Sequence, residues 1–182
     1  GIAIGDTTYY DAGSNTNVSS TLNGSVSAGT GGITLTGTVG GGTTNGGIQL
    51  VHAASALAST GNLALTSTGN VIGSGSFSVT GTTSITATTY DVTLTNTSNS
   101  FTGAVSVVSA ANVDIKSTND LTLGAIAMTG NLTAEALAGS VTVAGAISKT
   151  SGADATLTLK ATQDIVTNDS ITSTANKLHT VF

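Results

Sequence analysis

The sequence contains no cysteine, no proline and no tryptophan among its 182 residues, and it has only six aromatic side chains. Without cysteine the chain does not rely on disulfide bonds, and its redox compartment is not constrained. An ordinary globular core of this size uses more aromatic residues. The composition therefore indicates a narrow interior filled by small aliphatic side chains, in which bulky rings fit poorly.

Charge is also scarce, because only 7% of the residues are charged, against about a quarter in soluble proteins generally. Nine acids stand against four lysines, no arginine is present, and the net charge is −5. A nucleic acid or an anionic membrane surface needs a basic footprint, so neither is an expected partner. No apolar run approaches the roughly 18 residues of a membrane-spanning helix, and we expect no membrane insertion.

Serine and threonine make up roughly a third of the chain, and short apolar–polar–apolar triplets recur between them. Such alternation places successive side chains on opposite faces of a half-buried strand. Glycine, asparagine, serine and aspartate cluster between the triplets and favour turns. The best helical candidate, residues 51–57, is too short to be stable by itself. The predicted strands are centred on residues 33–35, 63–65, 77–79, 92–94, 105–107, 113–115, 121–123, 141–143 and 157–159.

Five segments resemble one another, which is the signature of a repeat architecture. Their alignment starts at Leu63, Val92, Val113, Leu132 and Leu157, at intervals of 29, 21, 19 and 25 residues. The 29-residue interval indicates either an inserted loop or a misalignment. The mean interval exceeds a two-stranded hairpin and matches one circuit of a parallel β-helix. We predict an all-β parallel β-helix, a β-solenoid of roughly eight coils of about 20–25 residues, with coils about 4.8 Å apart. Residues 51–182 form the predicted solenoid, and residues 1–50 form an N-terminal cap or irregular first coils.

Stacking of the aligned segments predicts columns of equivalent side chains. One outward column contains Thr66, Thr95, Lys116, Glu135 and Lys160, so that charges of opposite sign lie on neighbouring strands. A turn column contains Asn70, Asn99, Asp120, Gly139 and Asp164. A ladder of amides is expected just before the strands at Asn62, Asn112 and Asn131.

No group of residues indicates catalysis, and we predict no catalytic, cofactor-binding or metal-binding residues and no cofactor. His52 and His179 lack a second metal ligand at a suitable spacing. Asp120 and Asp164 share the turn column, but a further coil separates them, and two carboxylates do not make a calcium site. The glycine-rich stretch 40–47 lacks the lysine and the helix of a phosphate-binding loop. Matches to the N-glycosylation pattern occur at Asn17, Asn23, Asn96, Asn131 and Asn168.

Residues 90–150 resemble the repeat region of filamentous haemagglutinin-type bacterial adhesins, which use two-partner or autotransporter secretion. The resemblance rests on the segments NTSNSFTGAVSV, ANVDIKSTNDLTLG and TGNLTAEALAGSVTVAGAISKT. It implies a right-handed β-helix, export, and a role as a stalk or filament shaft outside the cell or at its surface. The family's secretion-domain motif has no counterpart in this sequence, so the chain is expected to be a fragment of a longer protein or a small assembling subunit.

The function that we expect is therefore that of a non-catalytic extracellular structural protein, not an enzyme. Residues 1–5 and 178–182 are apolar and uncharged except at His179, which favours end-to-end association through exposed strand edges or strand donation. A host or surface glycan is the ligand class that such a stalk would meet. Recurrent Thr-x-Thr pairs leave an ice-binding solenoid as an alternative. A polysaccharide lyase or hydrolase is a second alternative, although dispersed acids and missing arginine argue against it.

Overall fold

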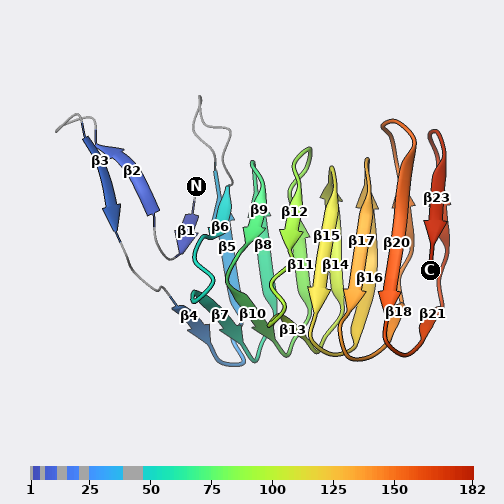
Figure 1. The fold of residues 1–182 in the computed structure, drawn as a ribbon, viewed down its shortest axis with the longest axis horizontal. Helices are drawn as coiled ribbons and strands as arrows, with labels where there is room; N and C mark the ends of the chain where they lie inside the picture. Colours follow the sequence, from blue (N-terminus) through green and yellow to red (C-terminus); the bar gives the residue numbers. More distant parts are fainter. Residues whose placement is uncertain (1, 5–6, 12–15, 21–24, 39–46) are drawn as a thin grey trace.

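The structure is a computed structural model that describes the backbone of residues 2–4, 7–11, 16–20, 25–38 and 47–182, and the side chains of residues 25–38 and 47–182. The described residues form strands and turns, without a helix. Parallel strands stack into a β-solenoid of about six turns, whose coils follow one another along the long axis of the molecule (Figure 1). The predicted β-helix is therefore confirmed.

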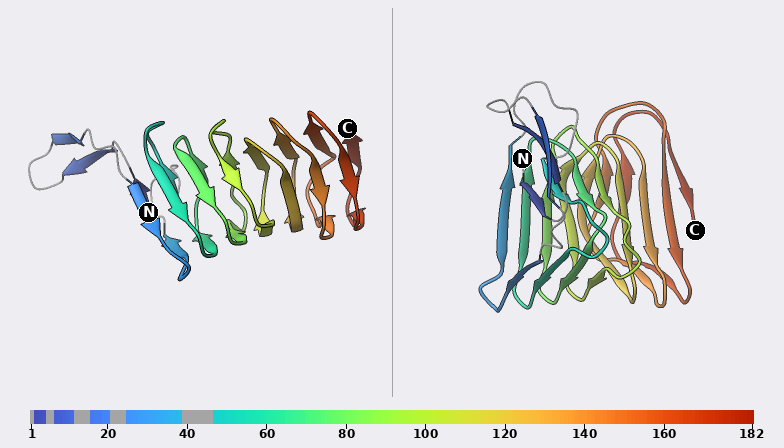
Figure 2. Two further views of the ribbon diagram at one scale, coloured as in Figure 1. Left: turned by 90° about the horizontal axis from the view of Figure 1, so that it is seen from below. Right: turned by 60° about the vertical axis from the view of Figure 1, so that its left-hand side comes forward.

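Each coil contributes strands to successive faces of the solenoid (Figure 2). The first face, which we call face A, is the eight-stranded sheet β1 (Ile2–Ile4), β6 (Ile48–Leu50), β9 (Val71–Gly73), β12 (Val92–Leu94), β15 (Val113–Ser117), β17 (Leu132–Ala136), β20 (Ala155–Ala161) and β23 (Leu178–Val181). A four-stranded sheet contains β4 (Ser25–Ala28), β7 (Ala56–Ser59), β10 (Ser76–Val79) and β13 (Ser100–Phe101).

The remaining strands of the solenoid form a nine-stranded sheet, which we call face D. Its strands are β5 (Ile33–Gly37), β8 (Leu63–Ser67), β11 (Thr83–Thr86), β14 (Val105–Ala110), β16 (Leu121–Met128), β18 (Val141–Val143), β19 (Ile147–Lys149), β21 (Ile165–Thr167) and β22 (Ile171–Ser173). The long strand β16 turns a corner without a break, because its first half pairs with β18 and its second half pairs with β19.

The pairing register confirms most of the repeat alignment and corrects its first unit. Val92, Val113, Leu132 and Leu157 are consecutive partners on face A. Leu63 instead lies on face D, between Ile33 and Thr83. The partner of Val92 in the preceding coil is Val71, so the 29-residue interval was a misalignment.

The number of coils is lower than the eight predicted, because part of the N-terminal region does not form coils. Strands β2 (Thr7–Asp11) and β3 (Thr16–Ser20) pair antiparallel as a hairpin beside the stack (Figure 1). Strands β4, β5 and β6 pair in parallel with β7, β8 and β9. The boundary that we predicted at residue 50 stays a prediction. The helical candidate at residues 51–57 does not form a helix: residues 51–55 form a turn, and residues 56 and 57 begin β7.

The core is a continuous stack of aliphatic side chains from alternate strand positions, and it also holds two aromatic rings. Phe77 and Phe101 are buried, and their ring centroids lie 6.4 Å apart in a stacked arrangement. This corrects the expectation that bulky rings fit poorly in the core. Space for the Phe77 ring comes from Gly73, where a Cβ would lie 2.5 Å from Phe77 Cε2. No helix among the described residues is long and apolar enough to cross a membrane.

Candidate functional site

The corners that precede the strands of face A carry a ladder of polar side chains. Backbone N–H groups of one coil donate to side-chain oxygens of the coil before it. Asp91 N donates to Asn70 Oδ1 at 3.0 Å, Asn112 N donates to Asp91 Oδ1 at 3.0 Å, and Asn131 N donates to Asn112 Oδ1 at 2.8 Å. Thr156 N continues the ladder to Asn131 Oδ1 at 2.8 Å. The predicted stacking of Asn112 on Asn131 is confirmed.

The backbone C=O groups of the same corner residues accept hydrogen bonds from backbone N–H groups of the preceding coil. Val92 N donates to Asn112 O, and Val113 N donates to Asn131 O, both at 2.9 Å. Asp91, Asn112 and Asn131 are therefore each bonded to the preceding coil through their own N–H and their own C=O. A side-chain acceptor is needed at this point because an unpaired backbone N–H would be costly. The ladder thus fixes the register of consecutive coils.

The predicted ladder included Asn62 in place of Asn70, which was wrong. Asn62 lies at a corner before face D, where its Oδ1 accepts the N–H of Thr82 at 3.0 Å. A third column of this kind lies before β16, β18 and β21, where Ser140 N donates to Asp120 Oδ1 at 2.8 Å and Asp164 N donates to Ser140 Oγ at 3.2 Å. Similar chemistry at different corners therefore misled the alignment, since the corners are alike in composition.

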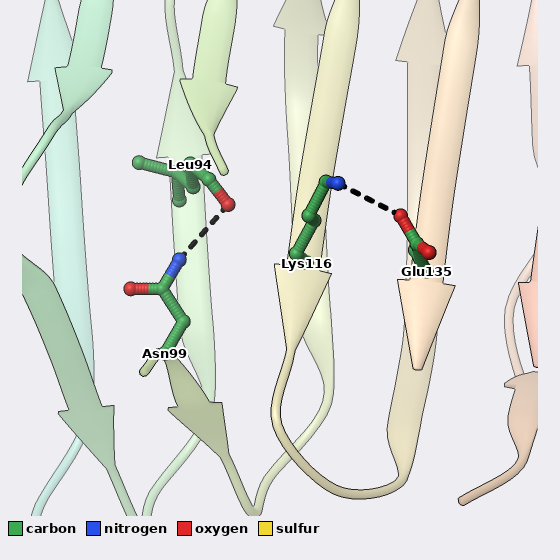
Figure 3. A network of polar contacts seen from close by, with 4 residues as sticks. All are labelled: Leu94, Asn99, Lys116 and Glu135. Carbon is green, nitrogen blue, oxygen red and sulfur yellow. Dashed lines mark hydrogen bonds and ion pairs between the residues drawn. The ribbon is translucent and has the colours of Figure 1, made fainter. Parts of the chain in front are cut away.

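Face A carries an ion pair at the predicted position. Lys116 on β15 pairs in register with Glu135 on β17, and their Nζ and Oε2 atoms lie 2.9 Å apart (Figure 3). Lys160 on β20 is the next residue in this column. Both members of the ion pair are partly exposed, so its contribution to stability is about 0.2–1 kcal/mol. The predicted column is confirmed from Lys116 to Lys160, but Thr66 lies on face D between Thr36 and Thr86.

Asp114 lies beside this ion pair on the outer side of β15, in register with Thr93 and Thr133. Its Oδ1 atom is buried and has no hydrogen-bond partner in the described part of the chain. Burial raises the pKa of the Asp114 carboxyl, and the Glu135 carboxylate adds to the rise, while Lys116 and Lys160 oppose it. Face A therefore combines one ion pair with one carboxylate that is poorly compensated.

Asn99 is a fully buried polar residue that links two coils at the corner before β13. Its Nδ2 donates to Leu94 O at 2.9 Å (Figure 3), and its Oδ1 accepts the N–H of Phe77 at 2.9 Å. Thr118 N donates to Asn99 O. Asn99 therefore does not belong to one simple turn column with Asn70, as the alignment predicted, because Asn70 bonds to Asp91 at a different corner.

The residues that we weighed for catalysis or metal binding lie apart from one another. The coil that carries Ser140 separates Asp120 from Asp164, as expected, although Ser140 and not Gly139 occupies the column. His52 lies in the turn before β7, and its Nδ1 accepts the N–H of Ala54. His179 is exposed on β23. The described residues contain no group of three or more His, Cys, Asp or Glu side chains that could hold a metal ion. Residues 40–46 of the glycine-rich stretch lie outside the described residues.

Two surface hollows accompany these features. One, of about 370 Å³, lies over β14, β16 and β19 on face D, and it is lined by Ser106, Val107, Val108, Ala125, Ile126, Ala127, Ala146 and Ser148. The other, of about 250 Å³, lies beside Asp120 and is lined also by Ser100, Phe101, Thr102, Asn119 and Thr122. Asp120 is the one titratable residue of either lining. A single carboxylate supplies no acid–base pair.

Residues 45–108 and 110–178 each match a family model described as repeats of unknown function (DUF5649). The chain belongs to this family. The first match covers strands β6 to β13 and nearly all of β14, and the second covers strands β15 to β22. Each match therefore covers about three coils of this solenoid. Comparison with curated proteins and with solved structures finds no match for the chain.

The sequence analysis missed the roles of Asp91, Asn99 and Lys149. Asp91 was hidden because an aspartate replaces the amide at one step of the asparagine ladder. Asn99 occupies a corner whose equivalents differ in residue type, so alignment could not reveal its burial. Lys149 lies outside the predicted strands and looks like a solvated charge in the sequence, yet it ends β19 and its side chain is fully buried.

The ladder predicts that Asn112→Ala destabilises the protein by about 1 kcal/mol, because Asn131 N loses its acceptor and Asp91 loses a donor. Urea unfolding followed by circular dichroism measures the change. Asn119→Ala is the matched control, since the exposed Asn119 side chain makes no hydrogen bond to the described part of the chain, and its effect should stay within about 0.5 kcal/mol. Equal effects of the two substitutions would contradict the ladder.

Asp114 predicts a pH dependence of stability. An acid whose pKa is raised by folding stabilises the folded state below its unfolded-state pKa, and this contribution is lost as the pH rises through the folded-state pKa. We expect Asp114→Asn to be more stable than the wild type at neutral pH, with the difference shrinking as the solution is acidified. Unfolding midpoints of the wild type and of Asp114→Asn, measured from neutral pH into the acidic range, give this difference in stability. A difference that grows on acidification would show that the carboxylate is stabilised in the folded protein.

Proposed function

We propose that this protein is a non-catalytic structural segment of an extracellular or cell-surface assembly, either a stalk of a bacterial adhesin or a subunit of a filament. The observation that carries the proposal is the unbroken parallel register of face A, which runs from β6 to β23. Such a stack transmits force along its axis through hydrogen bonds on every face. The resemblance of residues 90–150 to haemagglutinin-type adhesin repeats supports the same role.

Corner and face interactions make the stack suitable for a shaft. The corners of face A at Asp91, Asn112 and Asn131 join consecutive coils by reciprocal pairs of hydrogen bonds. The Lys116–Glu135 ion pair adds a side-chain contact between β15 and β17. Stability in such a solenoid is the sum of coil stabilities and nearest-neighbour terms. Length can therefore be extended by adding coils without changing the local chemistry, which is the property that a stalk or filament requires.

The last described coil supports association with a further coil. Ile165 and Ile171 occupy the positions that Val141 and Ile147 occupy one coil earlier, where the side chains are fully buried. In the last coil both are only partly buried, and Phe182 is 65% exposed. Strand β23 has a face A neighbour on one side alone, β20. We propose that a second copy supplies a strand to this edge, by end-to-end stacking or strand donation.

This association predicts different effects of two substitutions in β23. Thr180 pairs with the inward-facing Leu157, whereas His179 pairs with the outward-facing Thr156. A charge on the inward column should oppose a further strand, so we expect Thr180→Lys to abolish self-association and His179→Lys to preserve it. Sedimentation velocity with negative-stain microscopy measures assembly. A wild-type protein that stays monomeric at high concentration would contradict the proposed assembly, as would equal assembly of the two variants.

A second candidate function is ice binding, which one observation favours. Thr36, Thr66 and Thr86 are in register on β5, β8 and β11, and the strands are about 4.8 Å apart. Lysine and glutamate occupy the outward column of face A, at Lys116, Glu135 and Lys160, and do not interrupt the threonine column on these strands of face D. Thermal hysteresis of the purified protein measures this activity, with loss expected in Thr66→Tyr. Absence of hysteresis in the wild type excludes it.

A further inference from the structure

Lys149 is fully buried, although a lysine side chain ordinarily keeps its ammonium group in water. It occupies the inward position at the end of β19, where the partner in the preceding coil is Met128. In the described part of the chain no carboxylate lies within ion-pairing distance of its Nζ atom. A buried charge without compensation is costly, so its surroundings must supply polar partners.

Backbone carbonyl groups supply these partners. Lys149 Nζ donates to Ser151 O at 3.0 Å, to Gly152 O at 3.3 Å and to Ala175 O at 2.6 Å. An ammonium group has three donors, and all three are used. The acceptors come from two consecutive corners of the solenoid, residues 150–154 and residues 174–177.

Both corners are shaped to turn carbonyl groups inward. Gly152 has a φ of 87°, and a Cβ at this position would lie 2.2 Å from Thr129 O, so a larger residue is excluded. Asn176 has a φ of 58°, and its Nδ2 donates to Gly152 O at 2.7 Å. Lys177 N donates to Asp154 Oδ1 at 3.0 Å and holds the two corners together. The corner after Met128, residues 129–131, is shorter than the corners 150–154 and 174–177. In Figure 1 these two longer corners, before β20 and β23, project above the corner before β17.

We propose that these two corners form a cation site, lined by backbone carbonyl oxygens and selective for a primary ammonium group, which the chain fills with its own Lys149. The site pins the projecting corners to each other and to the core. Its chemistry differs from that of the preceding coil, where the apolar Met128 side chain fills the equivalent position.

The test removes the lysine side chain and supplies the missing atoms in solution. Lys149→Ala in the full chain leaves a space that matches n-propylammonium, and thermal unfolding is measured with and without this ion. We expect a lowered unfolding midpoint that n-propylammonium raises in a saturable manner. Tetramethylammonium, which has no N–H donor, and neutral 1-propanol should restore much less.

Met128→Ala is the matched control, because it truncates the equivalent inward side chain where no carbonyl site exists. It should be destabilised but should not respond selectively to n-propylammonium. The proposal is overturned if Lys149→Ala responds to n-propylammonium no more than Met128→Ala does.

A measurement on the wild-type protein keeps the proposal testable if Lys149→Ala does not fold. Nitrogen-15 labelling of lysine should show one ammonium resonance protected from exchange with water, whereas Lys116, Lys160 and Lys177 exchange rapidly. Lys149→Met, which copies the residue of the preceding coil, should lose that resonance and remain folded. Absence of a protected ammonium resonance in the wild type would overturn the site.

Discussion

Parallel pairing between consecutive coils is the constraint on which this structure depends. In a parallel ladder the N–H and C=O groups of successive residues point alternately to the coil before and the coil after. At the corners this alternation would leave N–H groups without partners. Asparagine, aspartate and serine side chains accept them, as in the ladder from Asn70 to Asn131. Because the corners set the register of the coils, simple aliphatic side chains such as valine and leucine are sufficient to fill the core.

The outward side chains of face A and face D differ in charge. Among the residues whose side chains the structure describes, the charged ones that point outward from strands are Asp114, Lys116, Glu135 and Lys160, all on face A. The strands of face D present hydroxyl and small apolar side chains outward. The buried polar side chains of Asn99 and Lys149 also form hydrogen bonds to backbone groups of adjacent coils. Polar chemistry in this molecule chiefly serves stacking, which is why a structural role is the function that we propose for these DUF5649 repeats.

The period-two alternation and the recurrence near Val92, Val113, Leu132 and Leu157 were sufficient to predict the solenoid and the Lys116–Glu135 pair, because pairing partners repeat residue types. The first unit failed because corners on different faces have the same composition, so Leu63 was assigned to the wrong face. The roles of Lys149 and Asn99 could not be predicted, since they depend on backbone conformation at corners of unequal length. The ring stack of Phe77 and Phe101 required the space at Gly73, which is visible only in three dimensions.

The stacking register itself can be measured directly, because the sequence has no cysteine of its own. Thr133 and Thr158 are partners in adjacent coils, and Val181 is the partner of Thr158 in the coil after. Adjacent coils, about 4.8 Å apart, suit a disulfide, whereas a separation of two coils does not. Under mild oxidation Thr133→Cys with Thr158→Cys should form an intramolecular disulfide, and Thr133→Cys with Val181→Cys should not. Failure of the first pair, or equal cross-linking of the second, would contradict the coil register.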